Sequence, residues 1–489
     1  MWAVLRNSDE GSTRTDRHFR YPGVLALPLA NRSGGDRLLS GSVPLRPAPT
    51  ANSGLRASPF SPKAVPGASP QGTFLFSVMR NQLVGNSLYL MLNSILQAGA
   101  GFIFWIISTH LFSVASVGLA TSLVSAASVI AFAGLLGLNS TMVRFLPSAR
   151  DRDVFITSAL AIVALFASLF ALLYVLAIPA VAPRLSFVTH DPLMGAGFVL
   201  LTVAGAVNVL TDSIFIGQRQ ARFNAVIDGG IGGITKVLAS LLVAGAGAYG
   251  LFAASSIGYA VAAVVSLIVL TYSDHFRPSL RKSAQVLRPL MRFSGANYIG
   301  SLLTLLPTFI VPLILLDRIG THATAYYYIA FQIVSLLYAA VYAVEQSFLS
   351  EGSHDDVELR SIMRRSWRLL AVICIPASLL LAVISHWLLL VFGRSYSANG
   401  TQALVVLSIS GLPFGAFYWL MTVLRLTGQL GSIVASNLVF AVSTCGLAWF
   451  FAPWGLSFVV LAWPIGLTAA ALTAAVPVWT WSRRHPMTV

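Results

Sequence analysis

The sequence predicts an all-α, polytopic membrane protein with about 12 transmembrane helices, arranged as two six-helix bundles around a V-shaped central cavity. Three observations support this prediction. The composition is strongly apolar, twelve separate runs are long enough to span a bilayer, and an internal parallel (6+6) repeat relates the first six runs to the last six.

The composition excludes a soluble protein. Of the 489 residues, 56% are hydrophobic and 10% are charged, and the mean hydropathy is +0.79, whereas a soluble domain carries about 25% charged residues. The net charge of +15 would suit a nucleic acid, but the basic residues follow the pattern of membrane topology, so no nucleic-acid partner is expected. The only cysteines, Cys374 and Cys445, fall in apolar runs and indicate neither a disulfide nor a metal site.

Residues 1–78 differ from the rest of the chain. They are basic, rich in Pro, Ser and Gly, and without lasting periodicity, which predicts a disordered N-terminal extension. The longest apolar piece, Val24–Ala30, is too short for a secretory signal. The extension is interpreted as an inert tail, as the product of a start codon placed before the true one at Met79, or as a basic arm on anionic lipid.

Each transmembrane run needs about 20 mostly apolar residues. The twelve runs that qualify are Leu83–Ser108, Val114–Leu138, Val154–Ile178, Leu193–Gly217, Asn224–Ala248, Leu251–Tyr272, Ala296–Asp317, Ala325–Leu349, Leu369–Phe392, Gln402–Arg425, Gly431–Phe451 and Leu456–Trp481.

The distribution of Lys and Arg predicts the orientation. The joints after even-numbered runs, together with the C-terminus, hold seventeen Lys and Arg residues, and the joints after odd-numbered runs hold three, Arg184, Arg318 and Arg394. Basic residues accumulate on the cytoplasmic side, so both termini are predicted to be cytoplasmic and the protein to lie in the cytoplasmic (inner) membrane. The basic segments Tyr272–Arg292 and Glu351–Arg368 are then expected to meet anionic headgroups.

Two matching separations indicate the internal repeat. Asn86 and Asn297 open the first and seventh runs at a separation of 211 (297 minus 86), and Gly217 and Gly428 are again 211 apart (428 minus 217). Six is an even number, so both halves keep one orientation. The predicted domains are an N-terminal bundle at 79–272, a cytoplasmic inter-bundle loop at 273–295 and a C-terminal bundle with a short cytoplasmic tail at 296–489. A cavity between two such bundles, exposed alternately by rocking, is the expected substrate site.

The fifth run contains the most unusual charge. Lys236 lies about 12 residues from the cytoplasmic start of this run, roughly 18 Å deep at about 1.5 Å per residue, which is too far for easy snorkelling. It is interpreted as a cavity cation that holds a pyrophosphate or acidic sugar, or as one half of an ion pair with Asp228 or Asp212. The nearby Gly229, Gly230, Gly232 and Gly233 allow either an unwound helix that lines the cavity or close small-residue packing, and packing is the preferred interpretation.

Other ionisable residues divide between two roles. Glu345 is a candidate coupling-ion site, together with Asp228 and Asp212, or a carboxylate within reach of water or of Arg364 and Arg365. Arg144 and Arg425 are candidates for binding a substrate phosphate at the cavity mouth, or topology anchors. Asn86 and Asn297 complete the candidate substrate-binding set. Asp317 and Arg318 are expected to form a solvated pair, and His386 to be a hydrogen-bonded packing residue.

Three stretches resemble a known family. Gly134–Arg152 (GLLGLNSTMVRFLPSARDR) is similar to the end of the second helix of polysaccharide-biosynthesis flippases, Asn297–Ile333 resembles their seventh and eighth helices, and Leu424–Gln429 (LRLTGQ) resembles the end of their tenth. The likeness covers about residues 80 to 482 and indicates the Wzx-like branch of the MOP superfamily.

This resemblance implies a function and partners. The family moves lipid-linked oligosaccharides, typically on a polyprenyl pyrophosphate, from the inner to the outer leaflet for cell-surface polysaccharide biosynthesis. The implied partners are the lipid-linked glycan, membrane lipids, and glycosyltransferases or a polymerase of the same pathway.

An enzyme, a metal site and a bound cofactor are not expected. The chain carries no Walker-type phosphate loop and no His, Cys or Asp cluster with metal spacing, and its longest external joint, at about 179–192, is too short for a periplasmic catalytic domain. Two other functions stay open. One is a drug/cation antiporter of the same superfamily, against which the first run counts because it has no acidic residue. The other is a non-transporting scaffold that recruits glycosyltransferases.

Overall fold

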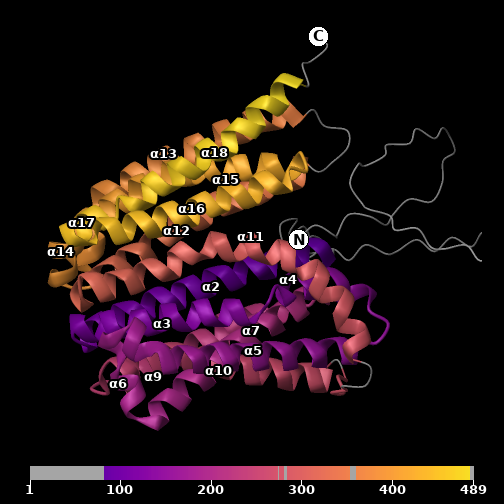
Figure 1. Cartoon of the computed structure of the whole chain (residues 1–489), viewed down its shortest axis with the longest axis horizontal. Coiled ribbons are helices and arrows are strands. Elements are labelled where there is room, and N and C mark those ends of the chain that lie inside the picture. Colours follow the sequence, from indigo (N-terminus) through magenta and orange to yellow (C-terminus); the bar gives the residue numbers. More distant parts are fainter. Residues whose placement is uncertain (1–81, 274, 280–282, 353–358, 485–489) are drawn as a thin grey trace, which may run out of the picture. The chain divides into compact units, whose positions relative to one another are not determined.

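The computed structural model describes residues 82–273, 275–279, 283–352 and 359–484 (Figure 1). The regular structure in these ranges is helical, without a strand. Among the described residues, twelve helices are long and apolar enough to cross a membrane. The predicted fold class and the number of spans are therefore confirmed. The predicted extension at 1–78 lies outside the described residues.

Six spans make up the first half of the described chain. They are α2 (Gln82–Leu111), α3 (Val114–Gly134), α5 (Arg152–Val181), α7 (Pro192–Gly217), the continuous segment α8 (Arg222–Asn224), η3 (Ala225–Gly232) and α9 (Gly233–Leu242), and α10 (Gly247–Ser273). The joints contain the short helices α4 (Leu138–Phe145), η1 (Leu146–Ser148), η2 (Pro183–Leu185) and α6 (Phe187–His190). In Figure 1 these helices run from indigo to magenta.

The second half has the same number of spans. They are α11 (Ser283–Arg318), α12 (Thr321–Gly352), α13 (Leu359–Leu390), α14 (Arg394–Ile409) continued by α15 (Gly411–Leu426), α16 (Leu430–Phe451) and α18 (Ala462–Arg484). Between the last two lie η4 (Ala452–Trp454) and α17 (Leu456–Val459). In both halves the first span packs on the fifth, the second on the third, the third on the fourth, and the sixth on the fourth and fifth. This recurrence is consistent with the 6+6 repeat, and the direction of its axis stays a prediction.

The two faces of α5 show why these sequences form membrane helices. Ala159, Val163, Ala167 and Ala171 are fully buried at four-residue spacing, whereas the neighbouring leucines at 165, 169, 172 and 173 are exposed. Lipid is as apolar as leucine, so helices associate where small residues allow close approach. Gly134 of α3 meets α5 at this stripe, where an added Cβ would lie 2.8 Å from the Ala167 Cα. The small residues thus determine which face is internal.

Helix α3 is the central element of the protein. It packs against α5, α7 and α10 in its own half and against α11 and α12 of the other half. Its buried hydroxyls bond to their own helix, with Ser122 donating to the Gly118 carbonyl at 2.9 Å and Ser125 to the Thr121 carbonyl at 2.8 Å. A Cβ on Gly118 would lie 1.9 Å from the Thr321 carbonyl oxygen at the start of α12. Only glycine allows this approach between the halves.

The fifth span is helical throughout, but its first part, η3, is a π-helix. A π-helix has hydrogen bonds between residues i and i+5. It is rare in proteins, and the examples that occur are frequently at functional sites. The glycines also pack closely, since a Cβ on Gly229 would lie 2.8 Å from Leu96 Cβ and one on Gly233 would lie 2.8 Å from Ala100 Cβ, both on α2. The preferred close-packing interpretation is therefore confirmed, and the unwound backbone is not observed.

The predicted inter-bundle loop at 273–295 ends before the candidate span Tyr298–Arg318, and part of it is helical. Helix α11 begins at Ser283, so the second part of the predicted loop is helical. The arginines at 288 and 292 lower the hydropathy of this part below that of a membrane span, although apolar residues recur at helical spacing, at Val286, Leu287, Leu290 and Met291. A hydropathy criterion detects the span and misses an amphipathic helical entry to it.

Candidate functional site

A cavity of ≈ 400 Å³ lies between the two halves. Its walls come from α2, α3, α9 and α10 of the first half and from α12 of the second, with Phe392 after α13. The lining residues are Asn93, Ser94, Gln97, Ala98, Gly101, Phe102, Phe104, Trp105, Val124, Lys236, Ser255, Tyr259, Tyr328, Gln332, Ser335, Leu336 and Phe392. This is the location in which the repeat predicts a substrate site.

Lys236 of α9 is the one charged residue in the described lining of this cavity. Neither Asp228 nor Asp212 makes a salt bridge with it, and within the described ranges no carboxylate lies within 4.0 Å of its ammonium group. The alternative interpretation, an ion pair of Lys236 with Asp228 on the same span or with Asp212 on α7, is therefore not observed in the described residues. A cation in a cavity without a fixed counter-ion is available to an anionic ligand.

Glycines on two neighbouring helices make room for this lysine. A Cβ on Gly258 of α10 would lie 3.1 Å from the Lys236 Cβ, and a Cβ on Gly101 of α2 would lie 3.7 Å from its Nζ. The stem of the lysine therefore passes between two small residues, and its ammonium group lies beside α2. An added Cβ would press on the lysine stem at Gly258 and would be in ordinary contact with Nζ at Gly101.

The rest of the lining combines amides, hydroxyls and aromatic rings. Gln97 donates to the Asn93 side-chain oxygen at 3.3 Å, one helical turn away on α2. Trp105 of α2 meets Tyr328 of α12 edge to face at a centroid distance of 5.1 Å, across the two halves. Neutral donors and aromatic faces around a single cation can bind a polar anionic headgroup. Sequence reasoning missed these residues, although the polar pair at i and i+4 in an apolar run was a detectable signal.

The two candidate carboxylates, Asp212 and Asp228, lie outside the cavity lining. Asp212 is on α7 and Asp228 on η3, and the Asn224 side chain, one turn before Asp228, donates to the Asp212 backbone carbonyl at 3.2 Å. Asp228 is 6% exposed and accepts a hydrogen bond of 2.7 Å from the Asn208 amide. These two hydrogen bonds tie α7 to the fifth span at the level of the two carboxylates.

Glu345 and Arg425, candidates for different roles, form one ion pair. An Arg425 NH group donates to Glu345 Oε1 at 2.6 Å, and the Thr422 hydroxyl donates to the same oxygen at 2.9 Å. Glu345 is 2% exposed, so this contact links α12 to α15 inside the second half. Binding of a substrate phosphate by Arg425 would have to compete with this carboxylate.

The other candidates lie outside the cavity lining. Asn86 accepts a hydrogen bond of 3.3 Å from the Ala221 backbone NH and so ties α2 to the turn after α7. Arg144 is exposed near the end of α4, over the Phe145 ring at 5.4 Å. Asn297 lies in α11, and its side chain is outside the described part of the structure.

The two remaining predictions concern polar groups near the helix ends. Asp317 and Arg318 form the expected pair at 3.9 Å, and both are partly exposed. His386 shares a hydrogen bond of 2.9 Å with Ser397, as expected for a packing residue.

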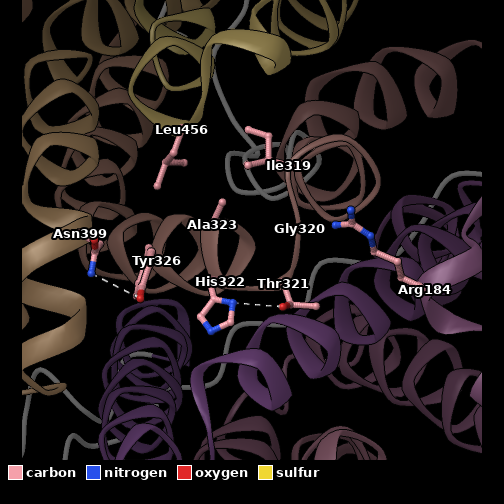
Figure 2. Close-up of a pocket in the computed structure, with 9 residues that line it drawn as sticks. All are labelled: Arg184, Ile319, Gly320, Thr321, His322, Ala323, Tyr326, Asn399 and Leu456. Atoms are coloured by element: carbon pink, nitrogen blue, oxygen red, sulfur yellow. Dashed lines mark hydrogen bonds between the residues drawn. The ribbon is translucent and has the colours of Figure 1, made fainter.

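A second cavity, of ≈ 570 Å³, surrounds the joint between α11 and α12 (Figure 2). Arg184 of η2 donates to the Leu316 carbonyl near the end of α11, which links the two halves at this site. Tyr326 receives a hydrogen bond of 3.4 Å from Asn399 and shares one of 2.8 Å with Ser395. In the sequence, Arg184 was counted only as evidence for membrane topology. In the structure, its side chain binds the backbone near the end of α11.

Solved structures with this fold are transporters. An inward-facing multidrug resistance MATE family transporter of the MOP superfamily superposes with a TM-score of 0.61 at 16% identity, covering 82% of this chain and 100% of that one. The lipid II flippase MurJ, in an inward closed conformation, gives 0.64 at 14% identity and covers 81% and 87%. A MOP superfamily transporter from Pyrococcus furiosus gives 0.52 at 14% identity and covers 82% and 95%. No curated protein matches the chain in sequence.

Twelve helices and a cavity between two halves define a multi-pass membrane protein with the fold of the MOP superfamily transporters. A family model described as "Polysaccharide biosynthesis protein" matches residues 106–399, which is more than half of the chain. The chain belongs to this polysaccharide biosynthesis family. The family predicted from the sequence is therefore confirmed.

Proposed function

We propose that this protein flips a lipid-linked oligosaccharide, carried on a polyprenyl pyrophosphate, across the cytoplasmic membrane by alternating access. The observation that carries the proposal is the position of Lys236 in the cavity, with no carboxylate partner in the part of the chain that the structure describes. The family match to polysaccharide biosynthesis supports the class of cargo. The fold shared with a lipid II flippase supports the type of movement.

The electrostatics favour an anionic headgroup. A charge inside a membrane protein is costly, so an unpaired one is kept where it has a function. A pyrophosphate that enters the cavity meets this cation in a medium that screens the attraction less than bulk water does. Amide groups of Asn93, Gln97 and Gln332 are available for sugar hydroxyls. A cavity of ≈ 400 Å³ is large enough for a headgroup, and the lipid chain would remain in the bilayer.

The proposal includes a location and partners. The protein is proposed to lie in the cytoplasmic (inner) membrane with both termini in the cytoplasm, as the asymmetry of Lys and Arg predicts. Glycosyltransferases or a polymerase of the same pathway would supply or consume the glycan on either side.

Replacement of Lys236 tests the proposal. Lys236→Ala and Lys236→Gln should abolish glycan export at normal expression, because losing a charge-assisted contact weakens binding by roughly 10- to 100-fold. Lys236→Arg should keep part of the activity, since a point charge suffices for phosphate. The measurement is surface glycan in a flippase-deficient strain, with membrane-inserted protein quantified in parallel.

A matched control is available on the same span. Arg222→Gln removes an exposed cation that stacks on Phe223 and does not line the cavity, so export should continue. If Lys236→Ala exports normally, the proposal is wrong. If Lys236→Ala unfolds the protein and a second replacement of Asp212 or Asp228 restores it, Lys236 is structural.

A drug/cation antiporter is the second candidate, because MATE transporters share the fold. The cavity counts against it, since its described lining has one cation and no carboxylate to attract a cationic drug. Drug resistance in an expressing strain, with no effect on surface glycan, would favour this candidate.

A further inference from the structure

We propose that the cavity around the joint between α11 and α12 is a second binding site, which takes an acidic saccharide on the side of the membrane that the Lys and Arg distribution predicts to be external. The ligand is a sugar with a carboxylate or phosphate group, bound through Arg184 and through the neutral polar side chains beside it. The binding itself does not depend on transport, whereas the identity of this saccharide as part of the cargo rests on the proposed function.

The residues that form this cavity all come from joints after odd-numbered spans. Arg184 lies in η2 after the third span, and Leu456 lies in α17 after the eleventh. The turn at Ile319–Ala323 follows the seventh span, and Asn399 lies near the start of α14, after the ninth. In Figure 1, α6, α14 and α17 lie at one end of the described helices. Four joints that are distant in the sequence therefore form one cavity at the end predicted to be external.

The three arginines that depart from the charge asymmetry gather at this cavity. They are Arg184, Arg318 and Arg394, the only basic residues in the joints after odd-numbered spans. Arg184 lines the cavity, and Arg318 directly precedes the turn that lines it. Arg394 directly precedes Ser395, whose hydroxyl shares a hydrogen bond of 2.8 Å with Tyr326 of the lining. Basic residues are disfavoured in external joints, so their grouping at one cavity indicates a role in binding an anion.

Arg184 has donors available for such an anion. Its guanidinium group has five N–H groups, and among the described residues its only hydrogen bond is the one to the Leu316 carbonyl. Gly320, at a φ of +134°, leaves room for this group, because a Cβ there would lie 2.9 Å from Arg184 Nη1. The described lining contains no carboxylate, and Asp317, next to the turn, pairs with Arg318 at 3.9 Å. A planar guanidinium without a fixed counter-ion suits a carboxylate or phosphate.

The rest of the lining offers neutral groups for sugar hydroxyls. In Figure 2, Thr321 and His322 lie between Arg184 and the pair formed by Tyr326 and Asn399. The Asn399 amide nitrogen donates to the Tyr326 hydroxyl at 3.4 Å and to a backbone carbonyl one turn earlier at 2.9 Å. Both contacts use the nitrogen, so the amide oxygen can accept a hydrogen bond from a ligand. The volume of ≈ 570 Å³ is within the range of small-molecule sites.

The position of this cavity suits a glycan that has left the cavity with Lys236. Tyr328 lines the cavity with Lys236, and Tyr326, two residues earlier on α12, lines the external one. Phe392 and Asn399 are divided between the two cavities in the same way. No described residue lines both. A saccharide that moves outward from the first cavity would therefore reach the second one next.

The test measures the binding of soluble trisaccharides to purified protein. An environment-sensitive fluorophore is attached at Ala398→Cys, an exposed position beside Asn399, in a background without Cys374 and Cys445, so that the signal reports this cavity. Trigalacturonate should give a saturable change in fluorescence. Maltotriose, a neutral trisaccharide, should bind roughly 10- to 100-fold more weakly, because it lacks the charge-assisted contact with Arg184.

Three variants locate the binding. Arg184→Gln should weaken the binding of trigalacturonate by the same factor and leave maltotriose nearly unchanged. Because Arg184 also holds the Leu316 carbonyl, Asn399→Ala is a second variant, which leaves that link between the halves intact and should weaken the binding of both trisaccharides. The control is His190→Ala, which removes an exposed side chain from the same joint as Arg184 but outside the lining, and it should change neither.

Three results would overturn the proposal. The first is equal binding of trigalacturonate and maltotriose. The second is unchanged affinity for trigalacturonate in folded Arg184→Gln and Asn399→Ala. The third is binding of sn-glycerol 1-phosphate, the free headgroup of phosphatidylglycerol, without binding of trigalacturonate, which would assign the site to a lipid. None of these measurements involves glycan export, so normal export by Lys236→Ala would refute the proposed function and leave this binding test intact, and the reverse also holds.

Discussion

Lys236 and the Glu345–Arg425 pair show two ways in which a membrane protein holds a charge. Lys236 lines a cavity, where water or a ligand can solvate it. Glu345 is 2% exposed and is satisfied by Arg425 at 2.6 Å and Thr422 at 2.9 Å. The first arrangement leaves a charge available for binding, whereas the second uses charge to link α12 to α15.

The ion pair leads to a prediction about stability. Arg425→Met leaves a buried carboxylate without its cation, which should lower the free energy of unfolding by roughly 2–3 kcal/mol, less than for a fully buried pair because the arginine is partly exposed. Glu345→Gln together with Arg425→Met should recover most of this loss. Thermal unfolding in detergent measures both, and equal stability of the single and double variants would contradict the prediction.

At the scale of elements, small residues decide which helices can touch. The interface between α3 and α12 depends on Gly118, where a Cβ would lie 1.9 Å from the Thr321 carbonyl oxygen. The π-helix η3 likewise approaches α10 at Gly232 and Gly258, where a Cβ on Gly258 would lie 2.6 Å from the Gly232 carbonyl oxygen. Backbone atoms cannot yield as a flexible side chain does, so these positions control the approach of whole helices.

Gly118→Ala should therefore separate the start of α12 from α3. The expected result is a longer distance between spin labels at Ser113 and His322, two exposed positions near this contact, in a background without Cys374 and Cys445. Gly99→Ala is the control, because a Cβ there meets nothing within 4 Å, and alanine should stabilise the helix by about 1 kcal/mol. An unchanged label distance in Gly118→Ala would contradict the close contact.

At the scale of the whole molecule, α11 connects the halves at two points. Arg184 donates to the Leu316 carbonyl near one end of α11, and Tyr298 donates to the Ala133 carbonyl at 2.9 Å farther along it. Alternating access by rocking would have to break at least one of these contacts. The cavity with Lys236 lies between the same halves. The side of the membrane to which this cavity is exposed would therefore depend on which of the two hydrogen bonds breaks.

The N-terminal extension leads to the prediction at this scale. The described spans begin with α2 at Gln82, and the composition of residues 1–74 offers little apolar surface for a packed core. Deletion of residues 1–74 should leave membrane insertion and glycan export intact. Quantifying inserted protein and surface glycan in the truncated form tests this, and loss of inserted protein would show that the extension is required.

The sequence alone determined the fold class, the twelve spans and the family. These depend on local hydropathy and on motif resemblance, which need no knowledge of neighbours in space. It also singled out Lys236, because a cation inside an apolar run is conspicuous. The helical part of the segment 273–295 was not predicted, because the arginines at 288 and 292 lower its hydropathy.

Only the tertiary structure decided the partner of each charge. Glu345 and Arg425 are 80 residues apart in the sequence, and Asn208 and Asp228 are 20 apart. Their pairing depends on how separate helices rotate and approach, which small residues such as Gly118 and Gly258 set through contacts a few ångströms wide. The absence of a carboxylate beside Lys236 among the described residues, the π-helix around Asp228 and the polar wall of the cavity follow from the same packing. A hydropathy pattern records how apolar a residue is, and the direction its side chain takes among twelve helices is fixed only when they pack.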